Sequence, residues 1–409
     1  MKSGRRLLLC LLLIAGCEDD DGIKNLEPTV LLVSMDGFRW DYLERTETPN
    51  LDYLVANGVK AESLVPVYPS STFPNHYTIA TGLYPENHGI VSNGMYDPEF
   101  DAFFYIGSGS EPARDGRWYE GEPIWVTAEK QEQTAMTMFW PGSDAEILGI
   151  RPTEYRQYDG SVKNRERVQQ ILTWLDLPKR KRPTFMTLYF SDTDSYGHNY
   201  GPDAPEMEIA IKEMDDQMGR LITGLDEVEL LDQVNIIITS DHGMARTSSA
   251  RLIMIDDHIS LNDVIMTGWG AYGGIWPNDG LEETIYEALS GSHPGWDVYK
   301  KNEIPERLHY RNHWRIPTIV GILDEAWSVT SKAYADSRPD AFEGGAHGYD
   351  PAYTSMHGIF IAYGPAFKEN VTVPSFRNIH LYEMMCHILE LTPASNDGSL
   401  DSVRAVFKN

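Results

Sequence analysis

The sequence predicts an α/β fold with a doubly wound, mainly parallel sheet that carries helices on both faces. Four short runs are continuously apolar or β-branched, as strands buried on both faces are: residues 29–35, 184–190, 234–240 and 358–363. Long segments with helical periodicity separate these runs, and alternating strands and helices build sheets of this kind. We therefore expect all four runs to lie in one parallel sheet.

Two helices can be placed from their patterns. Over 204–222, the residues Met207, Ile211, Met214, Met218 and Leu221 form one apolar stripe opposite acidic and polar residues. Over 73–81, Pro74 stands in the first turn, where proline is tolerated, and Gly82 follows the last residue. A third helix-like stretch, LYEMMCHILEL, contains Cys386, which we expect to be a buried structural thiol.

Composition limits the class of protein. With 409 residues, 42% of them hydrophobic, the chain can bury a large core as one domain with insertions or as two domains. Its 34 basic and 61 acidic residues give a net charge of −27. Binding of long nucleic acid needs a positive surface, so we do not expect it.

The N-terminus has the pattern of an export signal. Residues 1–16 combine Lys2, Arg5 and Arg6 with a short apolar run, which is too short to span a bilayer. The sequence before Cys17 resembles a bacterial lipobox, which implies lipidation of Cys17 and an acidic tether over 17–26; an ordinary signal peptide is the alternative. We expect an exported bacterial lipoprotein at the periplasmic or outer face of the envelope, in contact with the membrane only through its lipid.

Three of the predicted strands end in aspartate. The first runs into Asp36, the second into Asp192 and Asp194, and the third into Asp241. Since ligands bind beyond the carboxyl ends of parallel strands, these side chains should converge on one crevice. A single aspartate at such a point is often a helix N-cap, but three of them, two with histidines nearby, indicate metal ligands.

The spacing of the histidines supports a metal site. Asp194 and His198 stand four residues apart across what we expect to be a glycine turn, and Asp241 is followed by His242. Mixed oxygen and nitrogen ligands suit Zn²⁺ best, with Mn²⁺ or Fe²⁺ possible. With Asp36 these make five ligands, which is too many for one tetrahedral site and too few for two.

A sixth ligand is therefore expected, and His347 in a glycine-rich turn is the best candidate. His387 lies in an apolar helix, while His309 and His313 lie in a polar stretch that we expect to be exposed. Two metal ions close together promote in-line displacement at phosphorus.

The segment YPSSTFPNHYT offers three hydroxyls to such a site. Ser70, Ser71 and Thr72 all precede the predicted helix 73–81, and spacing alone does not choose among them. Phosphate oxygens arriving there would meet free backbone N–H groups at the helix start.

Seven segments carry a family resemblance. They are SMDGFRWDYL, YPSSTFPNHYTIATGLYPENHGIVSNGMYDP, FWPGSDAEI, YFSDTDSYGHNYGP, ITSDHGM, GAHGYDP and GIFIAYGPAF. In order and content they resemble the nucleotide pyrophosphatase/phosphodiesterase (type I phosphodiesterase) family of the alkaline phosphatase superfamily, from about residue 29 to beyond 367. The resemblance implies an alkaline-phosphatase-like core within a catalytic domain over 27–409. The match is weaker over 250–340, which we expect to be a small inserted capping subdomain.

The resemblance implies a role for each matched residue. Thr72 is the expected nucleophile, and Asn93 is expected to donate a hydrogen bond to a phosphate oxygen. Two Zn²⁺ ions are expected, one of them beside Thr72 and the other at a second site. Other divalent metals are possible. The implied ligands are Asp36, Asp241, His242 and Thr72 for the first ion, and Asp194, His198 and His347 for the second.

Phe73 and Tyr158 match the pair that sandwiches a nucleobase in nucleotide-selective members, and such stacking tolerates different bases. Two core aromatics are the alternative for an isolated pair. The chain departs from the family pattern at Thr193 and Tyr196, neither of which is a ligand, although Tyr196 is placed to reshape the wall of the pocket.

The expected activity is two-metal hydrolysis of phosphodiester and pyrophosphate bonds in nucleotides through a covalent threonine intermediate. ATP would give AMP and pyrophosphate, and dinucleotides would also be cleaved. The alternatives are a phospholipid or phosphocholine diesterase of the same family, or a binding lipoprotein without catalysis. The sequence indicates no oligomeric state.

Overall fold

The computed structural model describes residues 26–107 and 109–408. The signal peptide 1–16, Cys17 and all of the acidic tether except Leu26 lie outside the described residues. Among the helices of the described part, none is long and apolar enough to cross a membrane.

An eight-stranded sheet forms the centre of the molecule, in the order β19-β2-β18-β9-β1-β8-β6-β7. The strands are β1 (Thr29–Met35), β2 (Val59–Ala61), β6 (Ala135–Met138), β7 (Glu154–Arg156), β8 (Phe185–Phe190), β9 (Val234–Thr239), β18 (Phe360–Tyr363) and β19 (Val371–Val373). The run β9-β1-β8-β6-β7 is parallel throughout. This confirms the predicted α/β class and three of the four predicted strands as parallel neighbours.

The fourth predicted strand has the opposite direction. β18 is antiparallel to both of its neighbours, β9 and β2, so the expectation that residues 358–363 join a parallel arrangement is wrong. A strand buried on both faces is continuously apolar in either direction, so the sequence pattern does not distinguish them. Because Phe360, at the start of β18, pairs with Thr239, at the end of β9, the segment before β18 arrives at the edge where the parallel strands end.

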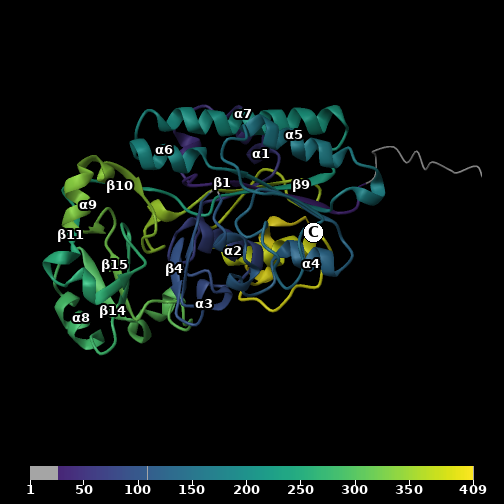
Figure 1. Cartoon of the computed structure of the whole chain (residues 1–409). Coiled ribbons are helices and arrows are strands. Elements are labelled where there is room, and N and C mark those ends of the chain that lie inside the picture. The colour runs from purple at the N-terminus through teal and green to yellow at the C-terminus, as the bar shows by residue number, and fades with distance from the viewer. Residues whose placement is uncertain (1–25, 108, 409) are drawn as a thin grey trace, which may run out of the picture.

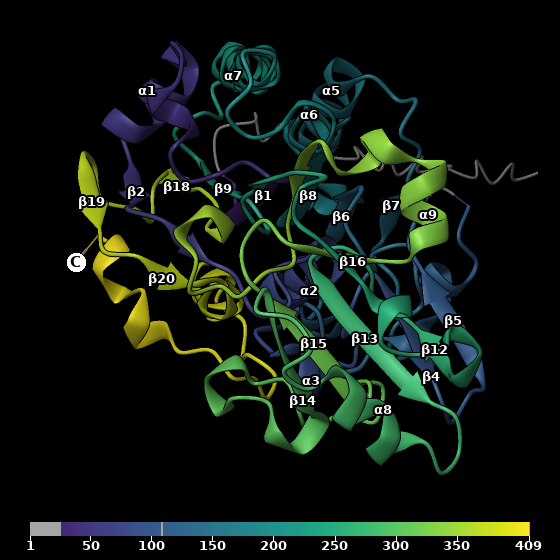
Figure 2. The ribbon, with the colours of Figure 1, turned by 90° about the vertical axis from the view of Figure 1, so that its left-hand side faces the viewer.

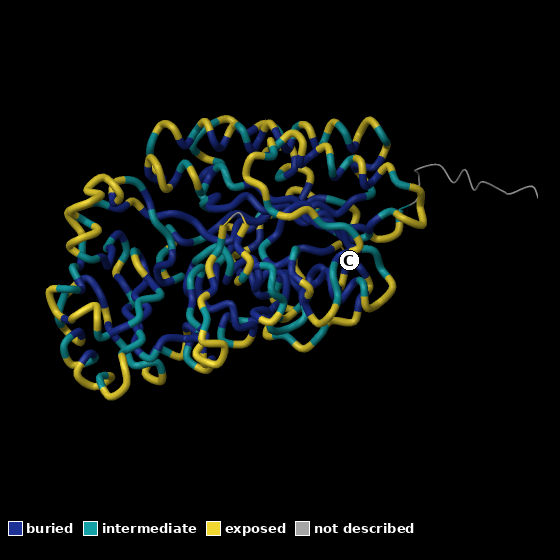
Figure 3. Tube along the Cα trace, viewed as in Figure 1, coloured by how far each residue is buried: buried dark blue, intermediate teal, exposed yellow. Residues whose placement is uncertain are grey.

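Helices cover both faces of this sheet (Figure 1). On one face lie α1 (Pro49–Ala56), α5 (Asn164–Leu175), α6 (Asp192–Tyr200) and α7 (Met207–Glu227); on the other lie α2 (Thr72–Thr81), α3 (Pro85–His88), α4 (Ile124–Lys130) and α10 (Leu381–Ile388). Alternate residues of β1 face the two layers: Val30 and Leu32 join one buried cluster, whereas Leu31 and Val33 join the other. The strands between the layers are the most continuously buried part of the trace (Figure 3).

The predicted helices are present with shifted ends. α7 begins at Met207 rather than at residue 204 and continues to Glu227, and α2 begins at Thr72, one residue before the predicted start. α2 ends at Gly82, whose φ of 69° is in the left-handed region that glycine adopts readily. Cys386 is buried in α10, as expected, and burial raises the pKa of its thiol to about 12.

A smaller lobe lies beside the sheet and is built around its own antiparallel sheet (Figure 2). The strand order is β12-β13-β15-β14, with β12 (Val264–Met266), β13 (Tyr272–Pro277), β14 (Trp296–Lys300) and β15 (Ile319–Leu323). Helix α8 (Glu282–Leu289) packs on this sheet, and the lobe has a separate buried cluster that includes Ile275, Leu289 and Ile319.

Four two-stranded pairs are also present among the described residues. They are β3 (Leu64–Val65) with β20 (Phe376–Arg377), β4 (Gly94–Asp97) with β5 (Ala102–Tyr105), β10 (Ala245–Thr247) with β17 (Gly344–Ala346), and β11 (Leu252–Met254) with β16 (Ser328–Thr330). Helix α9 (Lys332–Ser337) follows β16 and lies between the α6 end of the main sheet and the antiparallel lobe (Figures 1 and 2).

Candidate active site

The three strand-end aspartates meet at one edge of the sheet, as predicted. Asp36 follows β1, Asp241 lies two residues beyond β9, and Asp194 lies in the first turn of α6, which begins just after β8. Since β8 and β9 both pair in parallel with β1, their carboxyl ends share this edge.

The expected glycine turn between Asp194 and His198 is instead a turn of helix α6. Both side chains therefore lie on one face of the helix, at positions i and i+4. Gly197 stands inside this helix because an added Cβ would lie 2.8 Å from Cε of Met244.

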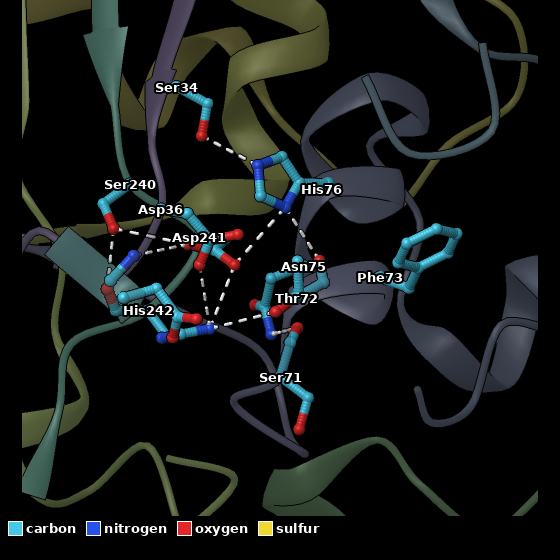
Figure 4. A network of polar contacts seen from close by, with 12 residues as sticks. Ser34, Asp36, Ser71, Thr72, Phe73, Asn75, His76, Ser240, Asp241 and His242 are labelled. Carbon is cyan, nitrogen blue, oxygen red and sulfur yellow. Dashed lines mark hydrogen bonds and ion pairs between the residues drawn. The ribbon is translucent and has the colours of Figure 1, made fainter. Parts of the chain in front are cut away.

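A first group of polar atoms surrounds Nε2 of His242 (Figure 4). This nitrogen lies 3.1 Å from Oδ2 of Asp241, 3.5 Å from Oδ1 of Asp36 and 3.3 Å from Oγ1 of Thr72. In a tetrahedral site with metal–ligand bonds of about 2.0 to 2.2 Å, the ligand atoms lie about 3.3 to 3.6 Å apart. These separations therefore suit a single small metal ion held among the four residues.

A second group surrounds Oδ1 of Asp194. This oxygen lies 3.3 Å from Nε2 of His198 and 3.6 Å from Nε2 of His347. The imidazoles of His242 and His347 are stacked with their centroids 3.5 Å apart, so the two groups adjoin. The structure thus brings together all seven residues that the sequence and the resemblance indicated as ligands.

The hydrogen bonds of the histidines fix which nitrogen faces each group. In each of His198, His242 and His347, Nδ1 lies 2.8 to 2.9 Å from a backbone carbonyl oxygen, namely that of Gly345, Gly243 or Ser70 respectively. A carbonyl only accepts, so Nδ1 carries a proton, and Nε2 is the nitrogen that faces the carboxylates and can bind a metal ion.

His76 is also close to this cluster, since its ring lies within 4.8 Å of Asp36 and Asp241. Its Nε2 lies 2.7 Å from Oγ of Ser34, and its Nδ1 lies 2.9 Å from the carbonyl oxygen of Thr72 and 3.3 Å from Oδ2 of Asp241 (Figure 4). Both ring nitrogens are engaged, so His76 orients Asp241 and the first turn of α2 and leaves the ligand role to His242.

Each of the three carboxylates keeps one buried oxygen without a hydrogen-bond partner among the described residues: Oδ1 of Asp36, Oδ1 of Asp194 and Oδ2 of Asp241. These are the oxygens that face the histidine nitrogens. Burial, followed by repulsion from Asp241 and Asp194, raises the pKa of Asp36 well above its ordinary value. The site therefore lacks positive charge, which divalent ions bound by this oxygen and imidazole set would supply.

The pKa values of the histidines shift in different directions. Burial opposes protonation of His198 and His242, but attraction to Asp194 and Asp241 prevails and raises the pKa of each imidazole, so a metal ion would have to displace a proton from Nε2. Burial, reinforced by the nearby His242, lowers the pKa of His347 to about 3, so its imidazole is neutral, as a metal ligand must be. Burial opposes the ionisation of Asp194, but attraction to His198 prevails and lowers the pKa of this carboxyl to about 2.

Of the three candidate hydroxyls, only that of Thr72 faces the cluster. Oγ of Ser70 donates to the carbonyl oxygen of Tyr349 at 2.7 Å and accepts from the N–H of Gly348 at 3.2 Å. The side chain of Ser71 points away from His242 (Figure 4). Thr72 is the first residue of α2, and this position directs Oγ1 at His242.

Asn93 forms a hydrogen bond with the first turn of α2. Its Oδ1 accepts a 2.8 Å bond from the N–H of Phe73, and its amide NH₂ has no partner among the described residues. Fewer backbone N–H groups are free at this helix start than expected: Asn93 takes that of Phe73, Pro74 has none, and the N–H of Asn75 bonds to the carbonyl of Ser71 at 3.1 Å.

Phe73 and Tyr158 line one cavity of about 280 Å³ that also reaches Thr72 and Asp36. Phe73 packs edge-on against Phe104 at 5.7 Å, and Tyr158 packs edge-on against Tyr189 at 5.9 Å. Both aromatics are only partly buried. They are walls of a cavity beside the candidate nucleophile and are not members of a closed core.

Comparison with known proteins places this site in a family. The family model described as type I phosphodiesterase/nucleotide pyrophosphatase matches residues 30–350, which contain every residue of the site. The chain belongs to this family. It is accordingly a phosphodiester hydrolase. The family depends on metal, and two sets of side chains in the described residues are close enough to hold an ion: Asp194, His242 and His347, and Asp36, His76 and Asp241. His242 lies between the two sets, and its assignment to the first ligand group follows the family resemblance.

Relatives in the family resemble the chain over nearly its whole length. It is 39% identical to human ectonucleotide pyrophosphatase/phosphodiesterase family member 5 over 93% of this chain and 78% of that protein. It is 40% identical to an uncharacterised pyrophosphatase/phosphodiesterase of Schizosaccharomyces pombe over 97% and 84% of the two chains. Some relatives are longer, since the chain spans 42% of human family member 1.

A solved structure shows the same fold. Murine ectonucleotide pyrophosphatase/phosphodiesterase 5, in an inactive threonine-to-alanine variant in complex with AMP, superposes with a TM-score of 0.88 at 38% identity. The match covers 93% of this chain and all of that one. Other relatives in the family are named as ectonucleotide or venom phosphodiesterases, which is consistent with export of this chain.

Reasoning from the sequence did not find several residues that contact the proposed metal ligands. The hydroxyl of Tyr189 donates a 2.6 Å bond to Oδ2 of Asp36, and His76 contacts Asp241. Thr193, which departs from the family pattern, donates its hydroxyl to the carbonyl oxygen of Asp36 and so supports the same strand end. Tyr196 lines a neighbouring polar cavity rather than the one that reaches Thr72.

The expected exposure of the histidines that were not chosen as metal ligands also needs correction. His313 was expected to be exposed, but it is buried and its Nε2 lies 3.0 Å from a carboxylate oxygen of Glu120. His309, also expected to be exposed, is half-buried and stacks on Tyr84, and His387 is exposed on α10.

Proposed function

We propose that the chain hydrolyses phosphodiester and pyrophosphate bonds in nucleotides, with Thr72 as nucleophile and two Zn²⁺ ions as cofactors. The observation that carries this proposal is the position of Thr72 Oγ1, 3.3 Å from Nε2 of His242, in a residue that lines the same cavity as Phe73 and Tyr158. One ion would be held by the first ligand group with Thr72, and the other by Asp194 and its two histidines.

Metal ions bound in these groups would lower the pKa of the threonine hydroxyl and stabilise both the attacking and the leaving oxygens. In the first step, Oγ1 of Thr72 forms a bond to phosphorus as the bond from phosphorus to the leaving oxygen breaks. In the second step, water cleaves the bond between Thr72 and phosphorus, and the hydroxyl is restored. ATP would yield AMP and pyrophosphate.

The surrounding residues hold the reacting groups in place. Helix α2 fixes the nucleophile, while Asn93 uses its acceptor on the N–H of Phe73 and keeps its NH₂ free to donate to a phosphate oxygen. Phe73 and Tyr158 would stack on the base, a contact worth about 1 to 3 kcal/mol per base. The AMP bound to the murine relative supports a nucleotide in this cavity.

We also propose that residues 27–409 form the catalytic domain, with 250–340 as an inserted capping region, and that the chain is exported as a lipoprotein anchored through Cys17. The first proposal is supported by the separate sheet of the smaller lobe. The second is supported by the residues before Cys17 alone.

Replacement of Thr72 by alanine tests the proposed nucleophile. We expect Thr72→Ala to lose ATP hydrolysis and to keep most of its bound metal, because the aspartates and histidines remain. Ser71→Ala is the matched control, since the adjacent hydroxyl faces away from the cluster (Figure 4), and it should hydrolyse ATP at the wild-type rate. Unchanged hydrolysis by Thr72→Ala in zinc-loaded protein would contradict the mechanism, and faster cleavage of lysophosphatidylcholine than of ATP would contradict the substrate.

A further inference from the structure

A second cavity, of about 560 Å³, adjoins His198 and shares no lining residue with the cavity that reaches Thr72. Its walls come from α6, from the β10–β17 pair, from residues 269–270 and from the segment that contains α9. Three aromatic side chains, Trp269, Tyr334 and Phe342, are among its lining residues. The cavity thus lies between His198 and the loop that connects β12 to β13.

The position of this cavity fits the departing half of a substrate. In an in-line displacement, the attacking and leaving oxygens lie on opposite sides of phosphorus. The attacking oxygen of Thr72 belongs to the first ligand group, so the leaving oxygen departs toward the second. There the side chain of His198 is 42% exposed, compared with 9% for His347, and it forms the boundary with the cavity.

Besides His198 and the three aromatic side chains, the cavity is lined by small residues and by the hydroxyl side chains of Thr247, Ser328, Thr330 and Ser331, none of which carries a charge. Trp269 and Tyr334 are 46% and 48% exposed, and Tyr334 meets Phe342 edge-on at 6.0 Å. No lysine or arginine is among the described residues that line the cavity, and the nearby Lys332 is paired with Asp257. A pyrophosphate leaving group would find no cationic side chain there, whereas a planar base would find surfaces on which to stack.

We propose that this cavity is a leaving-group subsite for a nucleoside monophosphate, so that dinucleotides are better substrates than ATP. The inference rests on the proposed function. With diadenosine diphosphate, Thr72 forms its bond to one phosphorus as the bridging P–O bond breaks, and AMP leaves with that electron pair while its base stacks on Trp269. Water then releases the second AMP from Thr72, so one substrate and one water give two AMP.

The test compares diadenosine diphosphate with ATP, because the two substrates share the retained adenylyl group and differ in the leaving group. We expect wild-type protein to have the higher kcat/KM for diadenosine diphosphate. Trp269→Ala should lower that kcat/KM by at least about five-fold, the loss expected for one stacked base, and leave that for ATP unchanged. Trp269→Phe keeps an aromatic surface and should retain most of the preference.

A binding measurement gives an independent readout. Isothermal titration should find two AMP molecules per wild-type chain and one per Trp269→Ala chain. Equal effects of Trp269→Ala on both substrates, or a single AMP in both proteins, would overturn the subsite. So would cleavage of glycerophosphocholine faster than diadenosine diphosphate, because an aromatic cavity also suits a quaternary ammonium group. Failure of the proposed function is distinguishable, since neither nucleotide would then be hydrolysed.

Discussion

The carbonyl oxygen of Ser70 accepts a 2.9 Å hydrogen bond from Nδ1 of His347, although 277 positions separate the two residues in the chain. Ser70 stands two residues before Thr72. The loop that presents the nucleophile to the first ligand group therefore also orients a ligand of the second group. This contact couples the positions of the two groups.

Loss of the Ser70 hydroxyl should weaken the second group. In Ser70→Ala, Oγ no longer donates to the carbonyl of Tyr349 or accepts from the N–H of Gly348, so the segment that begins at His347 loses two of its hydrogen bonds to the Ser70 loop and keeps the one to the Ser70 carbonyl. We expect metal affinity or kcat/KM to fall by about 10- to 100-fold, as for other residues that orient metal ligands. Metal content and kinetics measured beside Ser71→Ala check this, and equal values for the two variants would contradict it.

Tyr189 should support the first group. Tyr189→Phe removes only the oxygen that donates to Oδ2 of Asp36 at 2.6 Å, and the ring remains. Because this bond orients a ligand, we expect a loss of metal affinity of about 10-fold or more. Competition with a chelator measures the affinity directly. Wild-type affinity in this variant would show that Asp36 is held without Tyr189.

Phe73 should bind the base and take no part in the chemistry. For Phe73→Ala we expect kcat/KM for ATP to fall by about 5- to 150-fold, which corresponds to the loss of one stacked base. Hydrolysis of a diester without a base, such as bis(4-nitrophenyl) phosphate, should change little. Phe103, an exposed aromatic on β5, provides the control variant Phe103→Ala. Equal losses on both substrates would indicate that Phe73 positions Thr72 instead.

His88 should make folding stability depend on pH. Burial, reinforced by repulsion from His313, lowers the pKa of His88 to about 3, whereas the unfolded residue titrates near 6.5. The unfolded chain therefore binds more protons between these values, so the contribution of His88 to stability is full above pH 6.5 and declines as pH falls toward 3. By about pH 5 the loss should be roughly 2 kcal/mol.

The variant His88→Asn isolates this effect, because Oδ1 of asparagine can replace Nδ1 as the acceptor for the N–H of Ile90. Urea unfolding at several pH values should show a smaller decrease in the free energy of unfolding for the variant than for the wild type. Parallel curves for the two proteins would contradict the assignment.

Much of the site could be predicted because its signals are local. Asp36 and Asp241 follow strongly apolar strands, and the i, i+4 spacing of Asp194 and His198 is visible in the sequence. The choice of Thr72 over the two serines, and the role of Asn93, needed the family resemblance. The structure adds the reason for that choice, since Ser70 is engaged by the segment after His347.

The remaining features depend on partners distant in the sequence. The direction of β18 is set by pairing with β9, and a buried strand has the same pattern in either direction. The space beside Gly197 is taken by Met244, which is distant in the sequence, because an added Cβ would lie 2.8 Å from its Cε. His76, on α2, could not be distinguished from a core histidine in the sequence. The residues that contact it, Ser34 on β1 and Asp241 just beyond β9, are distant from it along the chain.

The stereochemistry of the reaction at phosphorus tests the central claim most directly. A phosphorothioate analogue of ATP, chiral at the α-phosphorus, is hydrolysed in ¹⁸O-labelled water, and the configuration of the labelled thio-AMP product is determined. Attack by Thr72 followed by attack by water inverts phosphorus twice, so the account predicts overall retention. Overall inversion would mean that water attacks directly, and it would contradict the covalent threonine intermediate.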